Sequence, residues 1–181
     1  MKDIIFKFAT ENDTQTIKDI VNKMYGIEYE TRDTKKIAEA IKNKTEIYVL
    51  AHKDDNCIGF CGSSINNDYY KDIISPDVAV IDYIYVDKKH RNFFLSFELI
   101  STLFKELVKN GTKQAIMQVQ TYNPQRFLHY ALSNKNIIKS TPVEVKGRIY
   151  EDQILLIEDL EKALNTKPRE LIIKAYNFKN K

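Results

Sequence analysis

A short basic turn stands between a strand-like segment and an amphipathic segment in the middle of the chain. The strand-like segment ends with VIDYIYV, the turn reads DKKHR, and the amphipathic segment begins at about Asn92. Arg91 and Asn92 therefore fall where a helix begins. The first turn of a helix offers backbone N–H groups without partners and the positive end of the helix dipole. This arrangement predicts a site for a phosphorylated cofactor.

The pattern of apolar residues predicts the elements that position this turn. Thr10 and Asp13 form a capping-box-like start to a first helix, with Asp in place of the usual Glu or Gln. Further helices are expected over residues 34–43, 94–109 and 124–133, the last with Pro124 in its first turn. Strands are expected over residues 4–9, 46–53, 57–65, 78–86, 114–120, 137–145 and 153–157.

This order of elements, β-α-α-β-β-β-α-β-α-β-β, predicts an α/β (α+β) fold. We expect a single domain with a mixed sheet of about seven strands flanked by about four helices. The helix 94–109 is a candidate for a parallel crossover between two strands, and ligands of open α/β sheets bind at the carboxyl ends of such strands. The domain is expected to span residues 1–160, with residues 161–181 as an extension packed on it.

Composition limits the classes of partner. The chain has 181 residues, of which 43% are hydrophobic, so it can bury a core as one compact domain. Its 28 Lys and Arg residues exceed its 25 Asp and Glu residues by only three, and no long basic run occurs. This mild charge indicates a solvated surface, and nucleic acid is not expected as a partner.

Cys57 and Cys61 lie on one face of a predicted strand, about 13 Å apart. This separation is too large for a disulfide, and no further Cys or His pair suggests a metal site. We therefore expect two small buried side chains in a reducing compartment, and no metal. The chain shows neither a signal peptide nor an apolar run of ~20 residues, which predicts a cytoplasmic protein without membrane contact.

The order of elements and the segment that follows Val86 resemble the GNAT superfamily of N-acetyltransferases. The family's cofactor motif runs from a strand and turn to Arg or Gln, two residues, Gly, any residue, and Gly or Ala, opening a leucine-rich helix. The motif positions are occupied here by Arg91, Asn92, Phe93, Phe94, Leu95 and Ser96. The resemblance implies acetyl-CoA as co-substrate, with these residues at its pyrophosphate.

Two positions depart from the family motif, because Phe94 stands where Gly is usual and Ser96 where Gly or Ala is usual. Glycine lets backbone N–H groups approach a pyrophosphate without a Cβ in the way. Ser96 is small and can add a hydroxyl donor. Phe94 either turns its ring into the core beneath the helix and leaves the amides accessible, or blocks the pyrophosphate. We favour the first alternative, since Phe94 can extend the apolar face of its helix.

A second segment carries the resemblance further along the chain. In the family, an Asn after the fifth strand binds the pantetheine arm, and a Tyr seven residues later is a frequent general acid for the leaving thiolate. Asn123 and Tyr130 have this spacing, which is about two helical turns and brings both to one side. The Gly-Phe pair that often follows the Tyr is absent. Without the resemblance, Tyr130 would be read as an aromatic residue on a helix face.

The central strand supplies the remaining candidates. Asp82 stands where many family members carry a Glu that deprotonates the incoming ammonium. Its alternative role is that of an acid at a strand edge or paired with a lysine. The resemblance implies that Ile84, Tyr85 and Val86 line the cofactor, Ile84 and Val86 through backbone groups. The alternation of the strand also allows Tyr83 and Tyr85 to be core or cleft wall.

The sequence leaves three functions open. The leading hypothesis is an N-acetyltransferase that moves acetyl from acetyl-CoA to a primary amine of a small molecule or peptide, by direct transfer in a ternary complex. The second is a non-catalytic relative that binds CoA weakly or not at all and serves as an interaction or regulatory module. The third is a small nucleic-acid binder, which the mild charge disfavours. A homodimer is compatible with the C-terminal tail packing on a neighbour.

Overall fold

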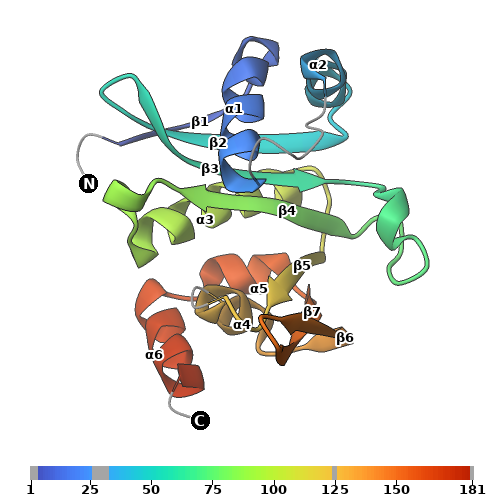
Figure 1. Ribbon diagram of the computed structural model, residues 1–181. Coiled ribbons are helices and arrows are strands. Elements are labelled where there is room, and N and C mark those ends of the chain that lie inside the picture. The colour runs from blue at the N-terminus through green and yellow to red at the C-terminus, as the bar shows by residue number, and fades with distance from the viewer. Residues whose placement is uncertain (1–3, 26–32, 124–125, 180–181) are drawn as a thin grey trace. The chain divides into compact units, whose positions relative to one another are not determined.

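A computed structural model describes residues 4–25, 33–123 and 126–179 of the chain. The described strands form one mixed sheet in the order β1-β2-β3-β4-β5-β7-β6, which confirms the predicted seven-stranded α/β fold (Figure 1). The strands are β1 (Ile5–Phe8), β2 (Glu46–Lys53), β3 (Asn56–Ser64), β4 (Ala79–Val86), β5 (Ala115–Gln120), β6 (Ile137–Val145) and β7 (Arg148–Ile157). The α-helices are α1 (Thr14–Tyr25), α2 (Thr34–Lys42), α3 (Phe93–Lys109), α4 (Phe127–Ser133), α5 (Leu160–Asn165) and α6 (Pro168–Lys179).

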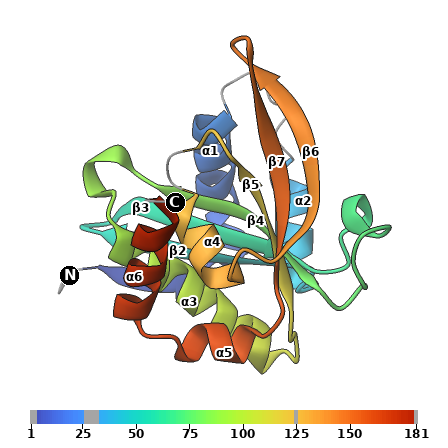
Figure 2. The same cartoon turned by 90° about the horizontal axis from the view of Figure 1, so that it is seen from below.

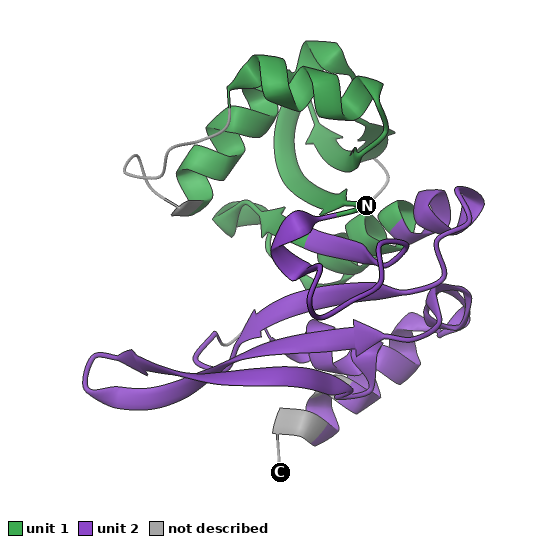
Figure 3. Ribbon diagram, turned by 90° about the vertical axis from the view of Figure 1, so that its right-hand side faces the viewer, with its two compact units in different colours: residues 1–66, 82–103 green, residues 67–81, 104–181 purple. Residues whose placement is uncertain are grey.

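The chain divides into two compact units (Figure 3). Unit 1 consists of residues 1–66 and 82–103, and unit 2 of residues 67–81 and 104–181. The division passes through β4 and α3, so each of these elements contributes to both units. It does not coincide with the boundary expected at residue 160, and the domain extent of 1–160 stays a prediction.

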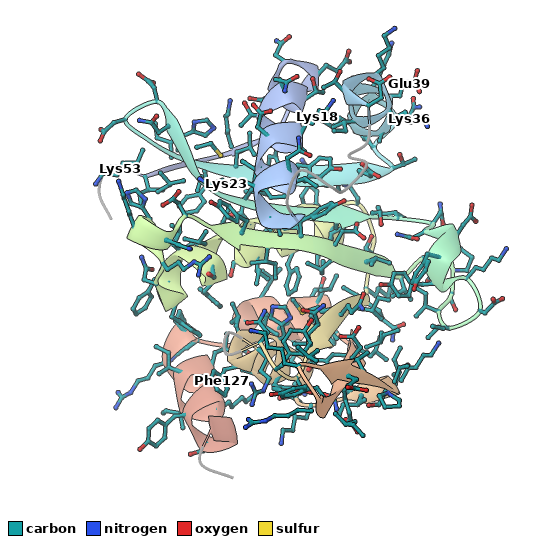
Figure 4. All side chains as sticks on the ribbon, in the orientation of Figure 1. Lys18, Lys23, Lys36, Glu39, Lys53 and Phe127 are labelled. Carbon is teal, nitrogen blue, oxygen red and sulfur yellow. The ribbon has the colours of Figure 1, made fainter. Side chains whose placement is uncertain are left out.

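In unit 1, α1 and α2 cover one face of the antiparallel strands β1, β2 and β3 (Figure 1). The capping box predicted before α1 is confirmed, because the Thr10 N–H and hydroxyl both donate to the Asp13 carboxylate at 2.9 Å. The side chains of Lys36 and Glu39 project from the outer side of α2 (Figure 4). The core beneath the helices consists of Ile17, Ile20, Ile37, Tyr48, Leu50 and Phe60, with Tyr83 and Tyr85 packed against it.

Gly62 makes room for an aromatic stack in this core. It pairs with Tyr48 across the hairpin of β2 and β3. A Cβ at Gly62 would lie 2.6 Å from the Cδ1 atom of Tyr48 and 3.2 Å from Tyr83. The Tyr48 ring stacks on Phe60 at 5.6 Å and on Tyr83 at 6.5 Å between ring centroids. The absence of a side chain at position 62 therefore lets the two tyrosines reach each other over β3.

In unit 2, the first half of β4 pairs in parallel with β5, from Ala79–Ala115 to Ile81–Met117. This confirms the predicted parallel crossover through α3. β7 pairs with both β5 and β6 in antiparallel fashion. It begins at Arg148, five residues before the predicted start, because residues 148–152 (RIYED) also pair with β6. Figure 2 shows β6 and β7 as a long two-stranded ribbon.

β6 is an edge strand whose side chains are mostly exposed, and it carries Pro142 near its centre. The tail that follows β7 forms α5 and α6, which the sequence left unassigned. Leu160 and Leu171 of these helices are buried, and α6 lies beside α4 (Figure 2). The predicted Pro124 start of the fourth helix lies outside the described residues, and α4 begins at Phe127.

We expect Gly62→Ala to lower the free energy of unfolding by about 1–3 kcal/mol, because the added methyl group overlaps the Tyr48 ring. Chemical denaturation measures the loss. The matched control is the same substitution in a Tyr48→Ala background, where the obstructing ring is gone and Gly62→Ala should cost much less. An equal cost in the two backgrounds would contradict this account of Gly62.

Candidate active site

The basic turn after β4 is fixed at both ends. The Asp87 carboxylate accepts a hydrogen bond from the Lys89 N–H at 3.0 Å, which closes a short 3-10 turn over Lys88–His90. The Asp87 N–H donates to the Ile58 carbonyl of β3 at 2.9 Å. Lys23, which projects from α1 (Figure 4), forms an ion pair with Asp87 at 3.1 Å. The turn is therefore anchored to β3 and α1, and it delivers the chain to the start of α3.

Asn92 directly precedes α3, which begins at Phe93, close to the start that the sequence predicts. Its side-chain oxygen accepts a hydrogen bond from the Leu95 N–H at 2.8 Å, and its side-chain nitrogen donates to the His90 carbonyl at 3.0 Å. This is an N-cap, which satisfies one of the N–H groups that a helix leaves without an internal acceptor. The amides of Phe93 and Phe94 have no acceptor in the part of the chain that the structure describes. Two donors thus remain available to an anion.

Arg91 lies directly before this helix start. Its Nε atom donates to the Val86 carbonyl at 3.1 Å, so the side chain folds back on the end of β4. The residue is exposed. The guanidinium keeps further N–H donors for a negatively charged group. Arg91 therefore lies next to the start of α3, as predicted.

The expectation that the Phe94 ring turns into the core is wrong. Phe94 is 46% exposed, and its ring packs edge-on against Phe93 with centroids 6.0 Å apart. Leu95 and Phe97 occupy the buried side of this first turn, and Phe93 stacks on Phe97 at 6.2 Å. Since these side chains already fill the space beneath the helix, Phe94 keeps nearly half of its surface in water. A half-exposed ring therefore stands at the position where the family motif has glycine.

Asp82 lies in the second half of β4 and is half-buried. Burial and then the negative charge of Asp82 raise the pKa of the buried Cys61 thiol well above its usual range, which places the two side chains near each other. Cys57 and Cys61 are both free, as predicted, although Cys57 is only partly buried. A raised pKa makes Cys61 an unreactive thiol, so it does not compete with Asp82 for a chemical role.

The Tyr83 and Tyr85 side chains pack against the core beneath α1 and α2, which is the core alternative of the sequence prediction. The Nζ atom of Lys23 lies 5.7 Å from the centroid of the Tyr85 ring. The Tyr85 ring therefore has packing partners in unit 1. Ile84 is half-buried, and the Val86 carbonyl is the acceptor for Arg91.

Unit 2 holds the second group of candidates. Asn123 follows β5 in a turn in which its N–H donates to the Gln120 carbonyl at 2.8 Å. The Asn123 carbonyl accepts a hydrogen bond from the Arg126 guanidinium at 3.0 Å. Thr121 binds the Glu151 backbone through two hydrogen bonds of 2.8 Å, which ties the carboxyl end of β5 to β7. Asn123 is thereby presented at the carboxyl end of a strand, as expected.

Tyr130 is buried on α4 and packs on Val119 and Leu155. Its hydroxyl donates to the side-chain oxygen of Gln153 at 2.6 Å. Burial raises the pKa of Tyr130, Arg126 lowers it, and Glu151 raises it, with a net rise. Tyr130 therefore keeps its proton at neutral pH, as a general acid must.

Gln153 and Glu151 were missed by the sequence reasoning. Gln153 stands at the start of the predicted strand 153–157 and Glu151 just before it, but both lie more than twenty residues from Tyr130 along the chain, so no local signal pairs them with it. Within unit 1 the structure brings Val86, Arg91 and Asn92 together, and within unit 2 it links Tyr130 to Gln153. The two groups are described each in its own unit.

Two classes of site are absent from the described residues. No group of three or more His, Cys, Asp or Glu side chains gathers in a way that would hold a metal ion. Over the same ranges, no helix combines the length and apolar character that crossing a bilayer requires.

Comparison with protein families gives one match. A model of the acetyltransferase (GNAT) family matches residues 14–129. This range contains the turn before α3, Asp82 and Asn123, and it ends one residue before Tyr130. No curated protein matches the sequence.

Solved structures of the same fold come from several organisms. The yncA structure from Salmonella typhimurium, solved with its cofactor acetyl-CoA, has a TM-score of 0.66 at 17% identity, over 86% of this chain and 94% of that one. The PaiA N-acetyltransferase of Thermoplasma acidophilum, in complex with coenzyme A, has a TM-score of 0.58 at 15% identity, over 86% and 98%. A chimera of the spermidine N-acetyltransferase SpeG of Vibrio cholerae and hSSAT has a TM-score of 0.60 at 14% identity, over 91% and 99%.

His129, next to Tyr130, gives a pH prediction. Its Nδ1 atom is buried and has no hydrogen-bond partner in the described residues, and burial lowers the His129 pKa to about 4 from its ordinary 6.5. Between these values the unfolded chain binds a proton that the folded protein does not, so the free energy of unfolding should fall as the pH falls from 6.5 towards 4.

Urea unfolding at several pH values across this window measures the effect. His129→Leu should reduce the slope of stability against pH there, because it removes the group that titrates. His52→Leu serves as the control. An unchanged slope in His129→Leu would contradict the assignment.

Proposed function

Because the chain belongs to the acetyltransferase (GNAT) family, we propose that it transfers an acetyl group from acetyl-CoA to a primary amine. The transfer occurs directly, in a ternary complex of protein, acetyl-CoA and acceptor. The observation that carries the proposal is the start of α3. There, the Phe93 and Phe94 amides have no acceptor among the described residues, and the exposed Arg91 lies beside them.

These groups suit a pyrophosphate. Backbone N–H donors and the positive end of a 17-residue helix stabilise negative charge, and the Arg91 guanidinium adds charge-assisted donors. Asn92 holds this geometry in place through its cap, and Ser96 offers a hydroxyl in the first turn. Structures of similar fold that contain acetyl-CoA or coenzyme A support the same cofactor class here.

In the proposed reaction, Asp82 accepts a proton from the acceptor ammonium, directly or through water. The resulting amine attacks the thioester carbonyl, whose developing negative charge is stabilised by backbone amides of β4. Asn123 binds the pantetheine arm. Tyr130 donates its proton to the CoA thiolate as the carbon–sulfur bond breaks, and burial, which raises the Tyr130 pKa, keeps the hydroxyl protonated until then.

The acceptor is a primary amine of a small molecule or a peptide. One structure of similar fold is named for spermidine acetylation, which supports an amine acceptor without fixing its identity. We keep the cytoplasm as the proposed location, because both cysteines are free thiols. The proposal includes a homodimer, because α6 exposes the apolar side chains of Ile172, Ile173 and Tyr176.

A second candidate function follows from Phe94. A half-exposed ring at the usual glycine position places bulk beside the two amides. If the ring excludes the pyrophosphate, the chain is a non-catalytic member of the family that serves as an interaction or regulatory module.

Isothermal titration with acetyl-CoA and CoA separates the two candidates. We expect the wild-type protein to bind both, and Phe94→Gly to bind several-fold more tightly because it removes the ring beside the amides. Phe94→Ala is the control that removes the ring but keeps a Cβ. If the wild-type protein does not bind either ligand at millimolar concentration, the enzyme proposal is wrong. Binding by Phe94→Gly alone would support the non-catalytic alternative.

Tyr130→Phe tests the general acid. The rate of acetyl transfer should fall by about 10²–10⁴-fold, the usual contribution of a positioned acid, while the affinity for acetyl-CoA changes little. Steady-state kinetics and titration measure the two quantities. Tyr176→Phe, on the exposed side of α6, is the matched control and should leave both unchanged. An unchanged rate in Tyr130→Phe would remove Tyr130 from the mechanism.

A further inference from the structure

The Tyr130 hydroxyl belongs to a series of side-chain hydrogen bonds in unit 2. It donates to the Oε1 atom of Gln153 at 2.6 Å, and the Nε2 atom of Gln153 donates to the Glu151 carboxylate at 2.7 Å. Gln153 is buried and Glu151 is exposed, so the series runs from the interior to the surface along one face of β7. Alternate residues of a strand share a face, which is why 151 and 153 can be linked in this way.

The chemistry of these groups fixes the direction of both hydrogen bonds. An ionised carboxylate only accepts hydrogen bonds, so the NH₂ group of Gln153 must face Glu151. The carbonyl oxygen of Gln153 then faces Tyr130, and it can only accept. The Tyr130 hydroxyl is therefore the donor. Two hydrogen bonds with Thr121 hold the Glu151 backbone, so the residue at the other end of this hydrogen-bond series is anchored as well.

We propose that Gln153 is a positioning residue that acts through Tyr130, with Glu151 fixing the orientation of its amide. This inference rests on the proposed function, in which Tyr130 is the general acid. In the resting protein Gln153 accepts the only proton of the Tyr130 hydroxyl, which fixes the position of the hydroxyl oxygen and keeps it protonated. A neutral amide accepts the hydrogen bond without taking the proton, whereas a carboxylate in direct contact would hold that proton more strongly.

The proton balance of the step is as follows. As the carbon–sulfur bond of the tetrahedral intermediate breaks, the sulfur keeps the electron pair. The Tyr130 O–H group then turns about the Cζ–Oη bond from Gln153 towards the sulfur, the O–H bond breaks, and its proton forms the S–H bond of free CoA. Water returns a proton to the Tyr130 oxygen before the next cycle. Gln153 exchanges no proton in any of these steps.

Three charged groups lie near Tyr130, and two of them, Arg126 and Glu151, shift its pKa. Arg126 precedes α4, Glu151 lies on β7, and the Lys135 Nζ atom is 5.8 Å from the ring centroid. Glu151 opposes loss of the proton, while Arg126 favours it. Neutralising Glu151 therefore has a defined sign, since it removes a negative charge that disfavours the tyrosinate.

A second series of hydrogen bonds between the same types of side chain, Tyr, Gln and an acid, provides a matched control. The Tyr70 hydroxyl donates to Gln118 at 3.1 Å, and Gln118 donates to the Asp152 carboxylate at 3.2 Å. Asp152 follows Glu151 on β7, so its side chain points to the other face of the sheet. A substitution there changes a Tyr–Gln–acid series without touching Tyr130.

The first experiment follows the titration of Tyr130 by NMR of the ring Cζ carbon, with Tyr130→Phe assigning the signal. Glu151→Gln, which keeps the shape and an acceptor oxygen, should lower the Tyr130 pKa, because it removes a negative charge that disfavours the tyrosinate. Asp152→Asn should leave that pKa unchanged. No shift in Glu151→Gln, or an equal shift in both variants, would overturn the proposal. This readout needs no substrate.

The second experiment measures kinetics with Gln153→Met, which matches the shape of glutamine and lacks its amide. We expect kcat to fall about tenfold with little change in KM for acetyl-CoA. In a Tyr130→Phe background the same substitution should have no further effect, because Gln153 acts through the hydroxyl. An equal loss in both backgrounds would overturn the proposal by showing a merely structural role. An inactive wild type with the expected titration would overturn the proposed function instead.

Discussion

A helix leaves its first four N–H groups without internal acceptors, and this constraint governs the start of α3. Asn92 accepts from Leu95, and the helix bond from Ser96 to the Asn92 carbonyl, at 3.5 Å, is long. The backbone N–H groups of Phe93 and Phe94 have no acceptor among the described residues. Three further contacts hold the start of α3 in place. Asp87 closes the preceding turn, Lys23 forms an ion pair with Asp87, and Arg91 folds back on β4.

The proposed chemistry is distributed over both compact units. Unit 1 carries the groups proposed for the pyrophosphate and the base Asp82, and unit 2 carries Asn123 and the acid Tyr130. The contacts that hold these two groups of residues in place also differ. At the start of α3, the Asn92 cap and the Arg91–Val86 hydrogen bond join neighbours in sequence, and the Asp87 turn before them is also anchored by Ile58 and Lys23. The Tyr130 hydroxyl is organised by β7, so its geometry depends on the assembly of the sheet.

This difference explains how much could be predicted from the sequence. The capping box of Thr10 and Asp13, the apolar stripe of α3 and the parallel crossover are local or periodic features, and their prediction was correct. Phe94 was wrongly placed because the competition with Leu95 and Phe97 for the buried side depends on the packed first turn. Gln153 could not be found, since its hydrogen bond joins residues 23 positions apart along the chain. The tail helices α5 and α6 gave only weak patterns either side of Pro168.

The edge strand β6 has a consequence for behaviour at high concentration. An exposed edge offers unpaired backbone groups to other chains, and its neighbour β7 adds the exposed Ile149 at the tip of the ribbon. Pro142 interrupts the row of donors because proline has no N–H, and Lys139 and Glu144 add charge along the same strand. Such residues oppose the growth of a continuous sheet between molecules, so the ribbon that extends unit 2 carries its own protection against aggregation.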